Sequence, residues 1–421
     1  MMMRTIARLL VYAGLLFSAG CASLEPFLTS LTPAPAPTRQ VTPAPTATAT
    51  EPAPVESDAP VLRVWLPAQF SPAAENDAAR LLKERLADFE NQHPGLKIDV
   101  RVKTMEGENS LLNSLKLTSL AAPGALPDLI ALSRSDLEAA ALTGLLHPID
   151  GLSTSLEDPN WYGYAQQLGR IQNTGYGLPF AGDALVLVYY PELGEIVTWK
   201  DVLASRGRLV FPASDPMGLV GLSLYASAGG ELLDAQGQPT LDQDALTRVL
   251  SLVEQGSAKG VIPSSLANVS TEAQTLQIYR TGAANTNKGI IWSLDYQLPS
   301  DGTIVPLPGL DETSYSFSTG WVWALSGSNP EHQQLAVELA EHLTAEDFVG
   351  EWTRKVGYLP TRPSNVGEEE RIITAILESA HPMPSEDVLK VLGPLMQEAL
   401  TRVLNGEKPE DVAVSVVQKL K

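Results

Sequence analysis

The sequence predicts an α/β protein whose folded part consists of two lobes. Patterns typical of strands and of helices alternate from residue 61 to the end of the chain. The first three run strand, helix, strand, and such a unit favours parallel strands. About 360 residues follow residue 60, which is more than one hydrophobic core usually contains, so we expect two lobes.

The first strand–helix–strand unit spans residues 61–104. "VLRVWL" (61–66) and "LKIDVRVKT" (96–104) alternate in polarity and contain β-branched residues, which predicts two strands. A helix is expected between them because apolar residues recur there at helical spacing, namely at Leu81, Leu82, Leu86 and Phe89. The dipeptide Pro94-Gly95 ends this helix.

The alternation continues to residue 150. "SLLNSLKLTSLAAPG" predicts a second helix, and "PDLIALS" (127–133) predicts a short third strand. A third helix is expected over 135–150, with Ser135 as its cap and an apolar stripe that reaches Gly144. These elements form the first α/β lobe.

A second region begins near Gly177. Strands are expected at 184–190, within "GRLVFPASDP", at 289–296, within "TIVPLPGL" and at 318–326. Helices are expected at 198–204, 217–229, 241–260, 329–357 with a break near Thr344, 385–406 and 408–420. No internal repeat of fixed period is present.

The only cysteine of the chain, Cys21, follows a targeting pattern. Arg4 and Arg8 precede the apolar run "LLVYAGLLF", which suits a signal peptide and is too short to span a bilayer. The segment "SAGC" resembles a bacterial lipobox, which implies that residues 1–20 are removed and Cys21 is lipidated. Ser18 stands where that motif usually has Leu, so an ordinary signal peptide with Cys21 as a bystander is the alternative.

Residues 21–60 are rich in Pro, Thr and Ala and contain few large apolar side chains. Such a segment cannot bury enough surface to offset its ordering entropy, so we expect a disordered tether. The sequence therefore predicts an extracytoplasmic protein that a lipid on Cys21 anchors to the cell membrane.

The acidic composition excludes some partners. Without residues 1–20, which contain two Arg and no acidic residue, 27 basic and 49 acidic residues remain, a formal charge of −22. Nucleic-acid binding requires clustered Lys and Arg, and flat docking on an anionic membrane requires the same. We therefore expect neither nucleic acid nor the membrane surface as the protein's main partner.

From residue 61 to about residue 365, the order of segments resembles the large family of sugar-binding proteins of ABC importers that includes maltose-binding protein. The resemblance is carried by six segments in order: "VLRVWL" with "LLKERLADFENQHPGLKIDV", "PDLIAL…DLEAAALTGLLHPID", "YGLPFAGDALVLVYYPEL", "PTLDQDALTRVLSLVEQGSAKGVIP", "VPLPGLDETSYSFSTGWVWALS" and "GYLPTRPS". One segment departs from the family pattern, because polar residues 285–288 stand where apolar residues are usual.

The resemblance implies a periplasmic-binding-protein-like fold, in which hinge strands join two α/β lobes and a ligand cleft lies between them. It implies chain crossings near 180–185, 289–292 and 320–326. Lobe 1 would contain residues 61–181 and 290–320, and lobe 2 would contain 182–289 and 321–421. The implied function is capture of a solute, and closure of the lobes on it, before delivery to a membrane permease. We expect a monomer without a cofactor.

The resemblance also suggests ligand-binding positions, because Asp and Gln suit sugar hydroxyls and aromatic rings suit the C–H face of a sugar. The candidates are Trp65, Gln69, Asp128, Asp183, Trp292, Trp321 and Tyr358. Each has a structural alternative. Trp65 and Tyr358 are equally suited to the core, Asp128 to a loop cap, and Asp183 to an Asx-turn. Trp321 and Trp323 share a strand face, and we expect Trp321 in the cleft and Trp323 in the core.

Two other function classes compete with import. An exported hydrolase is disfavoured because the five histidines lack H-E-x-x-H spacing, and C-x-x-C, S-x-x-K and G-x-S-x-G are absent. A sensor or receptor subunit would have the same fold and differ only in its partner. Within the import hypothesis, a carbohydrate is the expected solute, and a polyol, a glycerol phosphodiester or another small polar solute is the alternative.

Overall fold

The structure is a computed structural model that describes residues 60–281, 288–293, 302–310, 314–327, 329–363 and 370–420, with side chains omitted at 288, 292, 293 and 370. The chain divides into Met1–Ser57 and Asp58–Lys421, and all described residues lie in the second unit. The expected signal peptide, Cys21 and nearly all of the expected tether lie outside the described residues.

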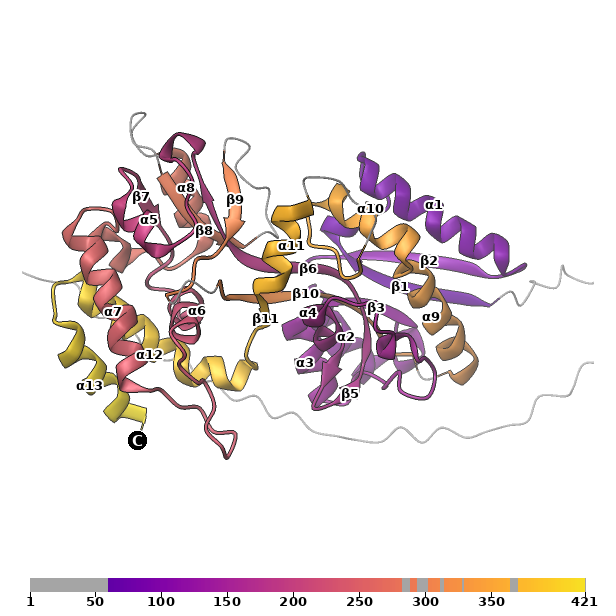
Figure 1. Ribbon diagram of the computed structural model, residues 1–421. Coiled ribbons are helices and arrows are strands. Elements are labelled where there is room, and N and C mark those ends of the chain that lie inside the picture. Colours follow the sequence, from indigo (N-terminus) through magenta and orange to yellow (C-terminus); the bar gives the residue numbers. More distant parts are fainter. Residues whose placement is uncertain are drawn as a thin grey trace, which may run out of the picture. The chain divides into compact units, whose positions relative to one another are not determined.

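Most described strands join one mixed sheet (Figure 1). Its main path is β2 (Lys97–Lys103), β1 (Val61–Pro67), β3 (Leu129–Ser133), β10 (Ser316–Leu325), β6 (Gly177–Tyr189), β8 (Lys288–Ser293) and β7 (Arg208–Val210). Two further strands attach to this path, β11 (Ala380–Pro382) to β10 and β9 (Thr303–Pro306) to β6. A separate pair comprises β4 (Arg170–Ile171) and β5 (Thr174–Gly175).

The helices are α1 (Asp77–Gln92), α2 (Leu111–Ala121), α3 (Arg134–Leu142), α4 (Gly163–Leu168), α5 (Trp199–Ala204), α6 (Leu219–Ser227), α7 (Gln243–Ala258), α8 (Glu272–Thr281), α9 (Pro330–Leu343), α10 (Glu346–Val356), α11 (Glu370–Ser379), α12 (Glu386–Leu404) and α13 (Pro409–Leu420). Short 3-10 turns lie at Ala68–Phe70, Pro123–Ala125, Ser155–Glu157, Pro191–Leu193 and Ser264–Asn268. No helix among the described residues is long and apolar enough to cross a membrane.

The predicted strand–helix–strand unit is confirmed. Strand β1 pairs in parallel with β2, and α1 connects them. Helix α1 begins after Asn76, whose side chain accepts the backbone N–H of Ala79 and so satisfies a donor of the first turn. Helices α9 and α10 pack against α1 (Figure 1).

Two helix boundaries follow local capping chemistry. The predicted break near Thr344 is confirmed, since Thr344 ends α9 and α10 begins at Glu346. The predicted cap at Ser135 is wrong. Strand β3 runs directly into α3, and the Ser133 hydroxyl accepts the N–H of Asp136, so Ser133 is the cap and Ser135 lies in the first turn.

Strand β6 is longer than the predicted 184–190 because its two halves have different partners. Residues 177–184 pair with β10, whereas residues 185–189 pair with β8 and β9. The predicted crossing near 180–185 therefore lies where one set of pairs gives way to the other. β10 is a second crossing, since Phe317 lies in one hydrophobic core and Trp321 in the other.

The cores divide the chain differently from the expected lobe boundaries. We expected residues 290–320 in lobe 1 and 321–421 in lobe 2, yet Leu307 and Phe317 lie in the second core. Helices α9 and α10 lie in the first core, through residues such as Leu339 and Trp352. The sequence pattern shows that a strand crosses between the lobes but does not show in which direction, because the direction depends on distant pairing partners.

Residues 289–292 belong to β8, which pairs along the second half of β6, and the crossing expected there stays a prediction. The third crossing occurs at β11, where Ala380 packs against the first core and Met383 packs against the second. Strand β11 runs parallel to the start of β10, so these two strands and β6 connect the lobes.

Candidate functional site

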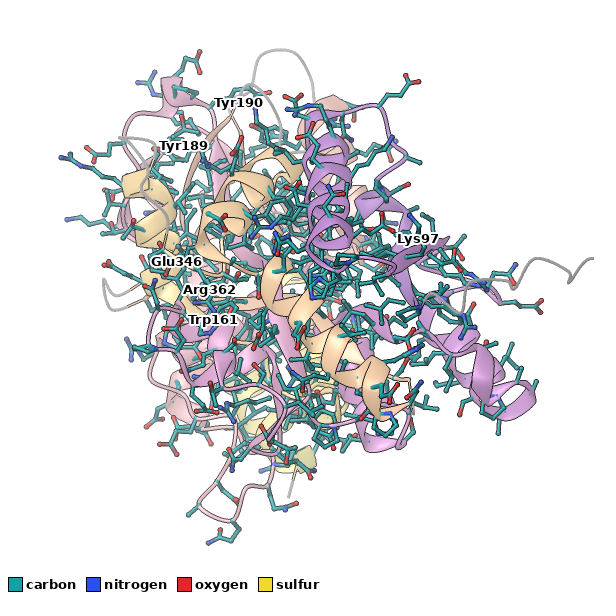
Figure 2. The ribbon with its side chains drawn as sticks, turned by 90° about the vertical axis from the view of Figure 1, so that its right-hand side faces the viewer. Lys97, Trp161, Tyr189, Tyr190, Glu346 and Arg362 are labelled. Carbon is teal, nitrogen blue, oxygen red and sulfur yellow. The ribbon has the colours of Figure 1, made fainter. Side chains whose placement is uncertain are left out.

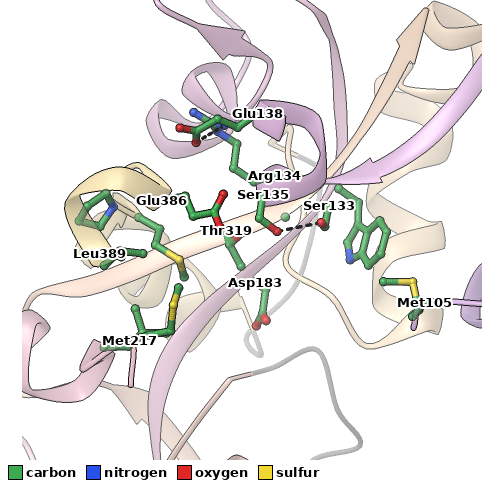
Figure 3. Close-up of a pocket in the computed structure, with 15 residues that line it drawn as sticks. Met105, Ser133, Arg134, Ser135, Glu138, Asp183, Met217, Thr319, Glu386 and Leu389 are labelled. Carbon is green, nitrogen blue, oxygen red and sulfur yellow. Dashed lines mark hydrogen bonds and ion pairs between the residues drawn. The ribbon is translucent and has the colours of Figure 1, made fainter. Parts of the chain in front are cut away.

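A cavity of about 310 Å³ lies where β6 and β10 pass between the lobes. This volume falls at the lower end of the range for small-molecule sites, roughly 300–1,000 Å³. Figure 3 shows the cavity with side chains from several separate elements around it. The lining residues are Met105, Ser133, Arg134, Ser135, Glu138, Asp183, Met217, Leu219, Thr319, Gly320, Trp321, Met383, Pro384, Glu386 and Leu389.

The floor of the cavity is formed by paired positions on the two crossing strands. Thr319 lies opposite Asp183, and Trp321 lies opposite Ala181. Gly320 is required between them, because a Cβ atom there would lie 2.3 Å from the carbonyl oxygen of Ala181. The close approach of the strands thus places an acid, a hydroxyl and an indole side by side along one edge of the cavity.

Asp183 is nearly completely buried, with 2% of its surface exposed. Its Oδ1 accepts the N–H of Ala184 at 2.8 Å, which orients the carboxylate next to the cavity. A buried carboxylate that is held by the backbone costs little to reorganise when a ligand hydroxyl approaches, so Asp183 is suited to accept a hydrogen bond.

The first wall belongs to the first lobe and consists of the junction between β3 and α3. The hydroxyls of Ser133 and Ser135 lie 3.1 Å apart, and Arg134 forms an ion pair with Glu138 at 3.2 Å. Burial lowers the pKa of Arg134, while the charge and hydrogen bond of Glu138 oppose this shift. This wall lies outside the carboxyl end of β3, the usual position of ligands in open α/β sheets.

The second wall belongs to the second lobe and is mostly aliphatic. Leu219 is the first residue of α6, Met217 lies two residues before it, and Leu389 comes from α12. Figure 3 labels Met217 and Leu389 on this side. The two helices can approach closely because Gly221 has no side chain, and a Cβ there would lie 2.4 Å from the Cγ atom of Met396. Glu386 is the charged residue on this side, and it pairs with Lys390 at 3.0 Å.

Of the seven predicted ligand residues, Asp183 and Trp321 line the cavity. Trp323 is not a lining residue, and its ring stacks on Phe180 with centroids 4.6 Å apart within the first core. Both indoles belong to the first core, and of the two only Trp321 also lines the cavity.

Gln69 and Tyr358 lie together but do not line the cavity. The Gln69 side-chain amide donates to the Tyr358 hydroxyl at 3.1 Å. Phe70 connects this pair to the site, since its ring centroid lies 5.5 Å from that of Tyr358 and 5.1 Å from that of Trp321. Leu359 forms two backbone hydrogen bonds with Gly182, which hold the segment around Tyr358 against β6.

Trp65 and Asp128 are buried away from the cavity lining. The Trp65 ring lies in the first core with the Lys103 ammonium 4.6 Å from its centroid. The Asp128 carboxylate accepts the N–H of Arg63 at 2.8 Å and lies 3.1 Å from Nδ1 of His332. The core position of Trp65 corresponds to its structural alternative, whereas Asp128 contacts β1 and α9 and not its own loop. The side chain of the seventh candidate, Trp292, lies outside the described residues.

Sequence reasoning missed Arg134, Glu138 and the three lining methionines, Met105, Met217 and Met383. Arg134 and Glu138 could have been predicted from the sequence, because they follow the end of a predicted strand at "LSRSDLE", where ligands of open α/β sheets usually lie. The methionines come from three distant segments, and no local pattern connects them. Among the described residues, no group of three or more His, Cys, Asp and Glu side chains could hold a metal ion.

The family of bacterial extracellular solute-binding proteins matches residues 84–371 of this chain. The chain belongs to this family. The resemblance stated from the sequence is thereby confirmed, and with it the expectation of an extracytoplasmic binding protein. No curated protein sequence matches this solute-binding protein.

Solved structures share the fold of this solute-binding protein. A cyclo/maltodextrin-binding protein complexed with maltotetraose has a TM-score of 0.67 and 20% identity, covering 85% of this chain and 96% of that one. The sugar-binding protein MalE from the phytopathogen Xanthomonas citri has a TM-score of 0.64 and 20% identity. The match covers 86% of this chain and 96% of that one. A cyclic alpha-maltosyl-1,6-maltose binding protein from Arthrobacter globiformis has a TM-score of 0.67 and 14% identity. The match covers 86% of this chain and 97% of that one. These likenesses confirm the periplasmic-binding-protein-like α/β fold.

Proposed function

We propose that this solute-binding protein captures a carbohydrate in the cavity between β6, β10, α3 and α12 and delivers it to the permease of an ABC importer. The observation that carries the proposal is the combination of Asp183, Thr319 and Trp321 at one edge of the cavity. A carboxylate and a hydroxyl suit the polar edge of a sugar ring, and an indole suits its C–H face.

The proposed ligand is a neutral solute. Arg134 is the lining residue with a positive charge, and its guanidinium is already paired with Glu138. Asp183 and Glu386 add negative charge. An anionic ligand would therefore meet more repulsion than attraction, whereas sugar hydroxyls can donate to these carboxylates. The similar folds of proteins described as binding maltodextrins also support a carbohydrate.

Closure of the lobes would couple binding to delivery. Three strands, β6, β10 and β11, connect the two cores, and the cavity is lined from both sides of these connections. A solute that contacts both walls favours the closed form by the free energy of those additional contacts. In this proposal the permease recognises the closed form, and binding involves no chemical turnover.

We further propose that a lipid on Cys21 anchors the protein to the cell membrane, with residues 21–60 as a tether. This proposal rests on the apolar run 9–17, the small residues before Cys21 and the Pro-rich composition that follows. Membrane fractionation tests it. Cys21→Ser should move the protein from the membrane fraction to the soluble extracytoplasmic fraction, and retention of the variant on membranes would contradict lipidation.

A thermal-shift screen against mono- and oligosaccharides, polyols and small polar solutes tests the ligand class. A ligand that binds only the folded state adds about 2.7 kcal/mol of stability at a hundredfold excess over its dissociation constant. We expect a shift with one saccharide class, lost in Trp321→Ala. A shift with a non-carbohydrate solute alone would contradict the proposed ligand and leave the family assignment unaffected.

A further inference from the structure

Methionines are concentrated at the cavity. Four methionines lie within the described residues, and three of them, Met105, Met217 and Met383, line it. The fourth, Met396, is fully buried in the second core. Met105 and Met217 keep 37% and 36% of their surfaces exposed, so core packing does not account for their positions. Exposed apolar side chains that gather at a concave site are typical of ligand contact.

The two walls of the cavity differ in chemistry. On the side of the first lobe, the cavity is lined by polar residues of the β3–α3 junction, namely Ser133, Arg134, Ser135 and Glu138. Met105, which lies between β2 and α2, is the aliphatic residue on this side. On the side of the second lobe, the aliphatic lining residues include Met217, Leu219, Pro384 and Leu389, of which Figure 3 labels Met217 and Leu389. Glu386 is the one charged residue among the described lining residues on that side.

An aliphatic wall is not the usual complement of an unsubstituted sugar. The C–H face of a pyranose packs best on a flat aromatic ring, and Trp321 is the aromatic residue among the described lining residues. Methionine side chains are unbranched and polarisable, so they adapt to flexible aliphatic groups. The wall formed by Met217, Leu219 and Leu389 is therefore suited to alkyl groups.

We propose that the solute is amphipathic, a saccharide that bears an aliphatic substituent. Its hydroxyls would contact Asp183, Thr319 and the β3–α3 junction, and its aliphatic group would contact Met217, Leu219 and Leu389. This inference rests on the proposed carbohydrate-binding function and specifies the substrate class of the same site.

Calorimetric titration with matched ligand pairs tests the inference. The full chain carrying Cys21→Ser, which removes the expected acylation site, is titrated with methyl and n-butyl β-glucoside and with methyl and n-butyl β-maltoside. Each buried CH₂ group raises affinity by a factor of roughly four, so three additional groups that are partly buried should give at least about tenfold tighter binding. We expect this preference for the butyl member of at least one pair.

Substitutions of Met217 test whether the preference for butyl over methyl glycosides arises at the aliphatic wall. Met217→Gln keeps the length of the side chain but makes its end polar, and it should reduce the butyl preference to less than about threefold. Met217→Leu keeps an aliphatic surface and should retain the preference. Leu233→Gln, which changes a 43% exposed residue outside the cavity lining, is the matched control and should leave both affinities unchanged.

The outcomes separate this inference from the proposed function. If the methyl and butyl glycosides bind equally, the proposal of an aliphatic substituent is overturned, while carbohydrate binding is supported. If Met217→Gln retains the full preference, the assignment to this wall is overturned. If no member of either pair binds and the saccharide screen is also flat, the proposed carbohydrate function is overturned, and this inference with it.

Discussion

The two hydrophobic cores are filled by different kinds of side chain. Among the side chains that the structure describes, the first core contains five tryptophans, Trp65, Trp161, Trp321, Trp323 and Trp352, whereas the second contains Trp199. The second core is largely aliphatic, with residues such as Leu246, Val249 and Leu250 from α7 packed near Val412 and Val416 from α13.

This difference extends into the cavity. Trp321 links the aromatic core to the floor, because Phe70 contacts both Trp321 and Trp352, at centroid distances of 5.1 and 5.4 Å. The aliphatic core reaches the cavity through Leu389, which is itself a member of that core. Trp321 and Leu389 thus each belong both to a core and to the cavity lining, so each core contributes its own kind of apolar side chain to the site.

Core substitutions should give the largest effects. Trp323→Ala should lower the free energy of unfolding by about 3–5 kcal/mol, because it removes a stacked indole that the surrounding rings cannot replace. Leu246→Ala in the second core should cost about 2–5 kcal/mol. Guanidinium unfolding followed by circular dichroism measures both changes.

Of Trp323→Ala and Leu246→Ala, only Trp323→Ala should also weaken ligand binding, because Trp323 lies two residues from Trp321 and in the same core. An equal loss of affinity in Leu246→Ala would contradict separate roles for the cores. Leu120→Ala, at a residue that is 85% exposed, is the control and should change stability by less than about 0.5 kcal/mol.

The next largest effect is on ligand affinity and concerns the cavity floor formed by β6 and β10. Asp183→Asn should weaken binding of the saccharide found in the thermal-shift screen by roughly tenfold to a hundredfold, since hydrogen bonds to charged groups contribute about 1.5–3 kcal/mol. The melting temperature without ligand should change little, because Asn can still accept the N–H of Ala184. An unchanged affinity would mean that Asp183 serves only to orient its own strand. Asp99→Asn on the edge strand β2 is the control.

A smaller, pH-dependent effect distinguishes two ion pairs of the first lobe. The Asp158 and Asp99 side chains are equally exposed, at 41%, but their partners differ. Arg101 is exposed, whereas Arg362 is 6% exposed and lies 3.7 Å from the centroid of Trp161 (Figure 2). Asp158→Asn leaves Arg362 without its carboxylate partner, so it should cost more than Asp99→Asn.

The hydrogen bond from Arg362 lowers the pKa of Asp158 below its ordinary value of 3.8. The stabilisation is therefore present above about pH 4 and is lost as the pH falls through the lowered pKa. At pH 7 we expect Asp158→Asn to cost about 1 kcal/mol, a figure discounted for solvent screening. Urea unfolding at several pH values measures it. A difference from the unsubstituted protein that persists at the lowest pH would contradict the linkage.

The smallest effect is expected at the surface of the second lobe. Glu398 on α12 contacts Lys419 at 2.6 Å and Arg402 at 3.2 Å, and the hydrogen bond from Lys419 lowers its pKa. Glu398→Gln should lower the free energy of unfolding by about 0.5 kcal/mol in low salt and by less at high ionic strength. Urea unfolding at two salt concentrations measures the change, and a loss independent of salt would indicate packing instead of charge.

Much of the fold follows from local patterns. Alternation predicted β1 and β2, short strand-like segments predicted β3 and β10, and apolar spacing predicted α1. The break between α9 and α10 at Thr344 was also predicted. The resemblance found Asp183 and Trp321, because both lie on strands that cross between the lobes. It did not find Arg134 or Met217, which reach the cavity only after α3 and α6 are packed.

The sequence by itself determined which segments form helices and strands and which of their faces are apolar, because these properties depend on residues a few positions apart. The tertiary structure decided which core each element joins and how the cavity is lined. Met105, Met217 and Met383 are each more than a hundred residues apart, and pairs such as Thr319 with Asp183 meet through strand register. Such contacts depend on pairing and packing between distant segments, which local spacing does not specify.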